Sequence, residues 1–202
     1  MVTMSRKQRR TMQRWETETR TWAKSEAQRL TQALGSGACL SRRANANGLL
    51  LVAGEELWAE GYCRYAQSGD PRFLPWTVTS QRLIGQLPSG KLVGPGWRDV
   101  LAVRSNLVAG SEWLAVDTAD LLFVLNGPAV APLAVAAICA TQGRAALARH
   151  PDLAPLRWSP VVNKLSRRVH PVAALGPGTP DPVLVRLQEL RSDDRPSEFI
   201  DV

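Results

Sequence analysis

Residues 73–91 read FLPWTVTSQRLIGQLPSGK, and this stretch decides the expected fold. Two runs of strand-forming residues, Phe73–Thr79 and Arg82–Leu87, stand on either side of a short polar step. The hydroxyls of Thr79–Ser80 can hydrogen-bond the backbone in the turn between the two runs. Pro88–Lys91, which reads Pro-Ser-Gly-Lys, is a tight-hairpin signal. The stretch therefore predicts antiparallel strands joined by short turns.

Similar strand-like segments continue on both sides of this stretch. Parallel strands need a crossover of a dozen or more residues, and the connections here are shorter than that. The sequence therefore predicts an antiparallel meander of seven short strands. Their expected positions are residues 57–66, 73–79, 82–87, 91–93, 97–103, 112–117 and 121–125.

The periodicity changes after Asn126-Gly127-Pro128, where small apolar residues follow helical spacing. One core-facing helix is expected over residues 130–149, with Gly143 as a weak point that costs about 1 kcal/mol relative to Ala. Prolines then recur along the chain, and one short helix is expected at residues 182–191. The expected organisation has three parts: a basic helical arm and linker at 1–48, a β-domain with its helix at 49–150, and a Pro-rich tail at 151–202.

Three short motifs lie within the expected β-domain: LLVAGEEL at residues 50–57, VTSQRLI at 78–84 and WRDVLAV at 97–103. They resemble the opening, the hairpin and a later strand of bacterial GRAM/PH-like (pleckstrin-homology-like) domains, over about residues 49–150. The resemblance implies an α+β fold, a seven-stranded antiparallel and partly open barrel closed by a C-terminal helix. It also implies a non-catalytic adaptor that binds lipid head groups, peptides or proteins, and the fold alone does not select among these.

Basic residues of this β-domain are the candidate ligand contacts of the body. The resemblance implies that head-group binding would use several basic residues around the first hairpin, but only Arg64 and Arg72 are present there. Arg82, in the hairpin motif, could contact a ligand, although such an arginine more often ties a turn to a neighbouring strand. The candidates on the body are Arg64, Arg72, Arg82 and Lys91.

The N-terminal arm carries the strongest functional pattern. Residues 5–34 contain no Gly or Pro and predict an amphipathic helix, or two shorter ones, with an apolar side opposite a basic side. Residues 1–47 hold ten Lys or Arg against three Asp or Glu, which accounts for the net charge of +7 of the whole chain. The candidate partner-binding residues of the arm are Arg6, Lys7, Arg9, Arg10, Arg14, Trp15, Arg20, Trp22 and Lys24.

Three functions fit this arm. The leading hypothesis is a non-enzymatic scaffold, in which the Trp-bearing stripe docks on the body or on a protein partner, or mediates self-association. A second is a peripheral membrane adaptor, whose helix lies on an anionic lipid surface. A third is nucleic-acid binding through phosphate contacts. A plainer alternative is a solvated arm that only keeps the protein soluble.

Catalysis, a cofactor and a metal site are not expected. The three cysteines lie far apart, only two histidines are present, and there is no phosphate-binding loop or hydrolase motif. No signal peptide is expected, and the most apolar run, residues 129–140, is too short to cross a bilayer. The prediction is a cytoplasmic protein with reduced thiols, soluble or peripheral to the membrane.

Overall fold

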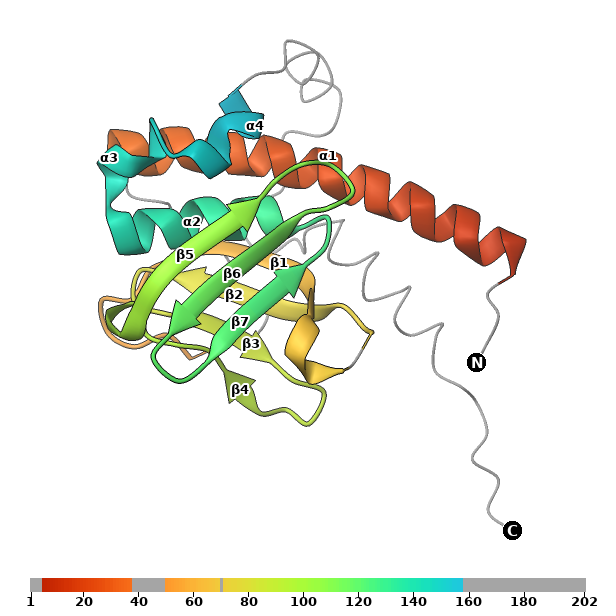
Figure 1. The fold of residues 1–202 in the computed structure, drawn as a ribbon, viewed down its shortest axis with the longest axis horizontal. Helices are drawn as coiled ribbons and strands as arrows, with labels where there is room; N and C mark the ends of the chain where they lie inside the picture. Colours follow the sequence, from red (N-terminus) through yellow and green to blue (C-terminus); the bar gives the residue numbers. More distant parts are fainter. Residues whose placement is uncertain (1–4, 38–49, 70, 158–202) are drawn as a thin grey trace.

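The computed structural model describes residues 5–37, 50–69 and 71–157 (Figure 1). One long helix precedes a set of strands, and short helices follow them. The helices are α1 (Arg6–Ser36), α2 (Val130–Gln142), α3 (Arg144–Leu147) and α4 (Ala154–Arg157), and the strands are β1 (Leu57–Tyr65), β2 (Leu74–Thr79), β3 (Leu83–Gln86), β4 (Leu92–Val93), β5 (Val100–Asn106), β6 (Trp113–Thr118) and β7 (Leu122–Asn126).

The strands form one antiparallel sheet of seven strands in the order β4-β3-β2-β1-β7-β6-β5. Strand β1 joins its two halves, because Leu57–Cys63 pairs with β2 whereas Arg64 and Tyr65 pair with β7. The sheet is not closed, since β4 and β5 lie at its two ends. The α+β class and the seven-stranded antiparallel sheet predicted from the sequence are confirmed.

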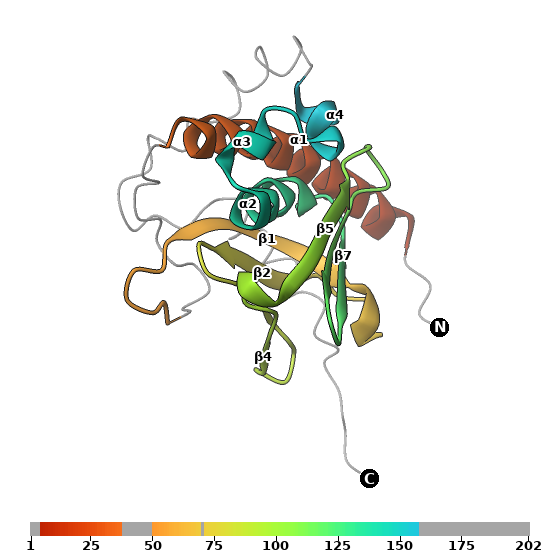
Figure 2. The ribbon, with the colours of Figure 1, turned by 60° about the vertical axis from the view of Figure 1, so that its left-hand side comes forward.

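The helices form two layers above the sheet. Helix α2 lies against the sheet, and α1 covers α2 from the other side (Figures 1 and 2). Every residue from Val130 to Cys139 is buried, as expected for a helix packed on both sides. Leu30 and Leu34 of α1 belong to the same hydrophobic cluster as the sheet and α2.

Two glycines permit close packing in this core. A side-chain carbon at Gly61 of β1 would lie 2.9 Å from the carbonyl oxygen of Ala129, just before α2. A side-chain carbon at Gly85 of β3 would lie 2.5 Å from the ring of Trp76, the residue of β2 that pairs with Gly85. Glycine at these positions therefore lets α2 and the Trp76 indole approach the sheet backbone.

Two predicted elements differ from the structure. The strand expected at residues 97–103 begins only at Val100, after a 3-10 turn at Trp97–Asp99 in which the Trp97 indole donates to the Thr79 carbonyl at 2.8 Å. The helix expected at residues 130–149 is broken at Gly143, whose positive φ of 82° interrupts the helical backbone. The helix predicted at residues 182–191 lies outside the described residues.

Helix α1 begins and ends with regular capping groups. The Ser5 hydroxyl accepts from the Gln8 amide at 3.2 Å, and the Gln8 side chain accepts from the Ser5 amide at 2.8 Å. At the other end, Gly37 has a left-handed φ of 75°, and its amide donates to the carbonyls of Ala33 and Leu34. One continuous helix, rather than two shorter ones, therefore spans the predicted arm.

Candidate functional site

The tryptophan-bearing side of α1 is packed onto the body. Trp15 is 5 % exposed, and its indole meets the ring of Phe73 edge-on with ring centroids 4.8 Å apart. Trp22 is half-buried and packs against the hydrophobic core. Ala23 and Ala27, on the same side of the helix, are fully buried. This stripe is therefore occupied by the protein's own core.

An ion pair also joins α1 to the sheet. The Arg20 guanidinium donates two hydrogen bonds to the Glu112 carboxylate. The longer of the two joins Nη2 of Arg20 to Oε2 of Glu112 at 3.5 Å. The Glu112 side chain is only 7 % exposed, and its Oε2 also accepts from the Gly110 amide at 2.9 Å. Arg20 was predicted as a partner contact, and its guanidinium holds the helix against the loop before β6.

A pocket of about 330 Å³ lies at this junction of α1 and the sheet. Arg64 of β1 lies in its wall, with the guanidinium carbon 4.5 Å from the Phe73 ring centroid. The pocket thus brings together Arg20 and Arg64, which were predicted separately for the arm and for the body. Its remaining walls come from Glu16, Phe73, Glu112, Trp113 and the segments at 110–111 and 126–128.

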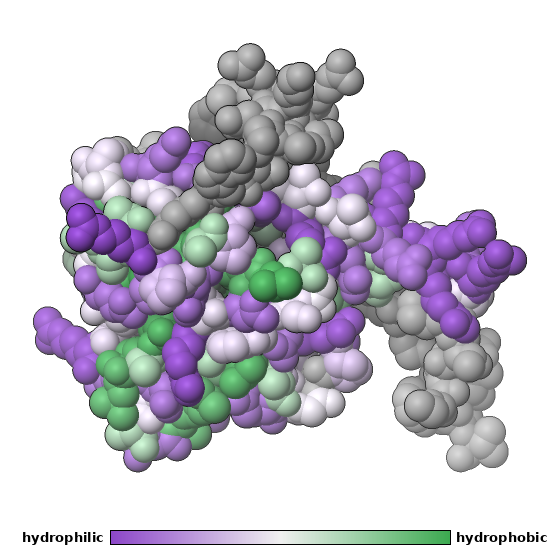
Figure 3. All heavy atoms as spheres, turned by 45° about the horizontal axis from the view of Figure 1, so that its top comes forward, coloured by the Kyte–Doolittle hydropathy of each residue, from purple (hydrophilic) through white to green (hydrophobic). Residues whose placement is uncertain are grey.

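The first turns of α1 project beyond the sheet (Figures 1 and 2). Residues 6–14 include five Lys or Arg and no Asp or Glu. All five side chains are exposed: Arg6, Lys7, Arg9, Arg10 and Arg14. This segment is called the basic end of α1 below, and Figure 3 shows the hydrophilic surface over it.

Three side chains of the basic end make no ion pair with the described part of the chain: Arg6, Lys7 and Arg10. Arg14 pairs with Glu18 at 2.8 Å, one turn along the helix, and both side chains are largely exposed. Lys24, further along α1, is half-buried. The predicted cations of the arm therefore divide into the projecting basic end and residues that lie beside the body.

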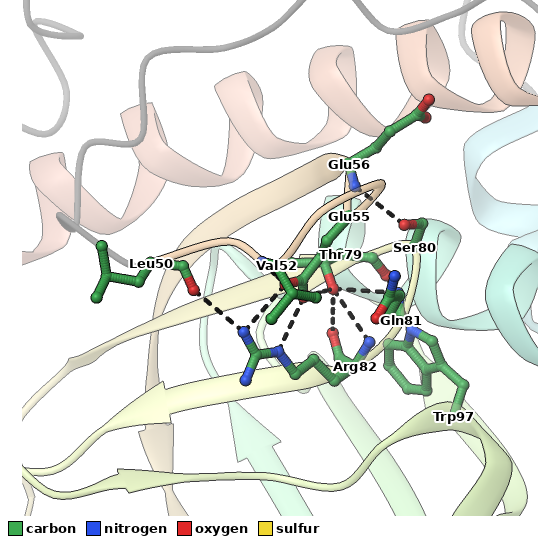
Figure 4. Close-up of polar contacts among 9 residues, drawn as sticks. All are labelled: Leu50, Val52, Glu55, Glu56, Thr79, Ser80, Gln81, Arg82 and Trp97. Carbon is green, nitrogen blue, oxygen red and sulfur yellow. Dashed lines mark hydrogen bonds and ion pairs between the residues drawn. The ribbon is translucent and has the colours of Figure 1, made fainter.

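Arg82 lies in a polar cluster beside the β2–β3 turn (Figure 4). Its guanidinium donates twice to the Glu55 carboxylate, at 2.9 and 3.0 Å, and once to the Leu50 carbonyl at 3.2 Å. The fully buried Thr79 hydroxyl contacts the same carboxylate at 2.6 Å. The cluster ties residues 50–56 to the turn, so Arg82 has the structural contacts that arginines near turns often make.

The surroundings of Glu55 favour its charged form. Burial alone would raise the pKa of this carboxyl group, but hydrogen bonds from Arg82, Thr79 and the Val52 amide outweigh burial and lower the pKa. The same contact raises the pKa of the Arg82 guanidinium. The pair is therefore ionised at neutral pH and has a structural role.

The other candidates on the body belong neither to the pocket nor to the cluster around Arg82. Arg72 and Lys91 are exposed, the first beside Phe73 and the second before β4. The thiols of Cys63 and Cys139 are buried, and burial raises the pKa of both. In the described ranges, no group of three or more His, Cys, Asp or Glu could hold a metal ion.

Sequence reasoning missed three residues of the junction: Phe73, Glu112 and Trp113. All three fall within strands predicted from the sequence, at residues 73–79 and 112–117, and strand periodicity gives them no functional role. Their partners on α1 lie far away in the sequence, so no local pattern could have connected them.

No family model matches this chain, and no curated protein matches it. Among the described helices, none is both long and apolar enough to cross a membrane.

Proposed function

We propose that this protein is a non-enzymatic binding and assembly protein, in which a PH-like body holds a basic helix out toward an acidic protein partner. One observation carries the proposal: the basic end of α1 is exposed, whereas Trp15 behind it is packed against Phe73. The tryptophan contact fixes the helix, and the cations point to solvent.

The position of the cations supports a binding role. The first turn of an α-helix carries partial positive charge, so each nearby cation is unfavourable by about 0.3–1 kcal/mol. Here three cations, Arg6, Lys7 and Arg9, lie in the first turn of α1, which has no acidic residue. Proteins break a local stability rule of this kind mostly at functional sites.

The distribution of the cations around the helix favours a protein groove. At 100° per residue, the five side chains cover an arc of about 160°. A groove with acidic walls can contact cations over the whole of this arc, because a groove that binds a helix encloses part of its circumference. A flat membrane surface meets only one line of the helix, and the tryptophans that would enter it are packed inward.

Nucleic acid is a weaker alternative. Phosphate binding usually draws on a broad basic surface. Residues 48–150 hold eight Lys or Arg and eight Asp or Glu, so the body adds no net positive charge. A helix segment of nine residues is only about 13 Å long and reaches few phosphates.

The order of the elements supports a PH-like body. Seven antiparallel strands precede α2, which packs on the sheet, as the motif resemblance implies. Such folds carry many functions, so the partner class is inferred from the surface rather than from the fold.

The test compares three probes at equal total charge and about 0.15 M salt: polyglutamate of about 20 residues, vesicles with phosphatidylglycerol, and duplex DNA. The arm variant R6Q/K7Q/R10Q is matched by the control R98Q/R104Q/R149Q, which removes three exposed cations of the body. Polyglutamate should bind most tightly. The arm variant should lose about tenfold in affinity and the control less than twofold.

Tighter binding of vesicles or of DNA than of polyglutamate would overturn the acidic-protein proposal in favour of a lipid or nucleic-acid partner. Equal losses in the two variants would show that the basic end has no special role.

A further inference from the structure

We infer that the acidic segment at residues 193–201 of this same chain binds the basic end of α1, and that an outside partner must displace it. Residues 193–201 hold four carboxylates, Asp193, Asp194, Glu198 and Asp201, against the single cation Arg195. The basic end holds five cations and no carboxylate. The two segments are thus complementary in charge and similar in length.

The basic end is open to such an occupant. The side chains of Arg6, Lys7 and Arg10 are exposed and make no ion pair with the described residues. At 100° per residue, Arg6 and Arg10 lie about 140–180° around α1 from Trp15, which faces Phe73, so a segment that binds there would not have to disturb the core.

The tail is long enough to reach the basic end of α1. The tail leaves the described structure beside α1, where the Gln28 side chain donates to the Leu156 carbonyl at 2.7 Å. From Gln28 to Arg10 is 18 residues of helix, or about 27 Å. The 35 residues at 158–192 connect the tail exit to Asp193, and even with the helix predicted at residues 182–191, the other 25 residues can span up to about 80 Å.

Because the linker is long enough to span this distance, binding of the acidic segment is an intramolecular step. Tethered segments of this kind reach effective concentrations on the order of 1 mM. A contact with a dissociation constant in that range would leave half or more of the basic ends covered. Neutralising the tail should therefore raise the affinity for an outside acidic probe by about two- to tenfold.

The test uses the full chain with a spin label on S197C, in a C39S background in which the two remaining thiols are buried. Amide signals of residues 6–14 should broaden selectively. The broadening should disappear in the neutral-tail variant D193N/D194N/E198Q/D201N and at about 0.5 M salt. Mixing labelled and unlabelled chains separates contact within a chain from contact between copies.

Selective broadening that persists in the neutral-tail variant, or broadening confined to the body, would refute the inference. So would broadening seen only between chains, which would point to pairing of two copies. The experiment contains no outside probe, so its outcome is independent of whether polyglutamate binds. In a second measurement, unchanged polyglutamate affinity in the neutral-tail variant would equally refute displacement.

Discussion

The indole of Trp15 meets the ring of Phe73 edge-on, with centroids 4.8 Å apart and planes at 67°. The guanidinium carbon of Arg64 lies 4.5 Å from the centroid of the same phenyl ring. Phe73 therefore contacts both the helix that carries the basic end and the exposed cation of the junction pocket. Phe73 is thus shared between the α1 contact and the wall of the pocket.

Replacing Trp15 with Ala should lower the free energy of unfolding by about 3 kcal/mol, because the change removes a buried aromatic side chain and its contact with Phe73. Urea denaturation followed by circular dichroism measures the effect. Met12→Ala, one turn earlier and half-buried, is the control and should lower it by no more than about 1 kcal/mol. Equal effects of the two changes would mean that α1 is not anchored at Trp15.

The Arg20–Glu112 ion pair should show a coupling energy of about 1 kcal/mol in a double-mutant cycle with R20Q and E112Q, because the Glu112 carboxylate is nearly buried. The exposed Arg14–Glu18 pair is the matched control within the same helix, and its coupling should be about 0.3–0.5 kcal/mol. If the two pairs couple equally, Arg20 does not dock the helix.

Glu55 should make stability depend on acid pH. Its folded pKa lies below the ordinary value of 4.5, so the unfolded chain binds its proton first. The stabilisation is therefore complete above about pH 4.5 and is lost as the pH falls through the folded pKa. Chemical denaturation from neutral to acid pH should show a shallower decline for E55Q than for the unaltered protein.

E55Q should also lower stability by about 2–3 kcal/mol at neutral pH, because the change leaves the Arg82 guanidinium without its anionic partner. An unchanged pH dependence in E55Q would contradict the assignment of the lowered pKa to this carboxyl group.

Gly85→Ala should destabilise the protein by about 1–3 kcal/mol, because the added methyl group would meet the Trp76 ring at 2.5 Å. Gly35→Ala is the control. It lies near the end of α1 with nothing within 4 Å of an added methyl group, and it should stabilise by about 0.5–1 kcal/mol. Thermal denaturation of both variants checks the opposite signs.

The local elements of the fold were predictable from the sequence. Helical spacing placed Trp15 and Trp22 on one side of a helix, and this side is the buried one. Alternation and turn residues predicted a strand at 73–79, and β2 occupies Leu74–Thr79. Gly143, predicted as a weak point, is where the backbone leaves α2. Each of these features depends on neighbours in the sequence.

The junction was not predictable, because its contacts join distant parts of the chain. Arg20 and Glu112 are 92 residues apart; the sequence predicted Arg20 as a partner contact and placed Glu112 at the start of a strand. The motif around Arg82 marked the β2–β3 turn, but Glu55, which neutralises Arg82, lies 27 residues earlier. Pairings of this kind depend on the tertiary fold, which local periodicity does not determine.

The most direct test of the central claim, that α1 is docked through Trp15 and presents its basic end to an acidic partner, is a nuclear magnetic resonance titration with polyglutamate. Shift changes should be concentrated at the amides of residues 6–14 and absent from the Trp15 indole, and R6Q/K7Q/R10Q should need about tenfold more polyglutamate to reach the same changes. Shift changes that map instead to the sheet, or that this variant reaches at the same polyglutamate concentration, would contradict the claim.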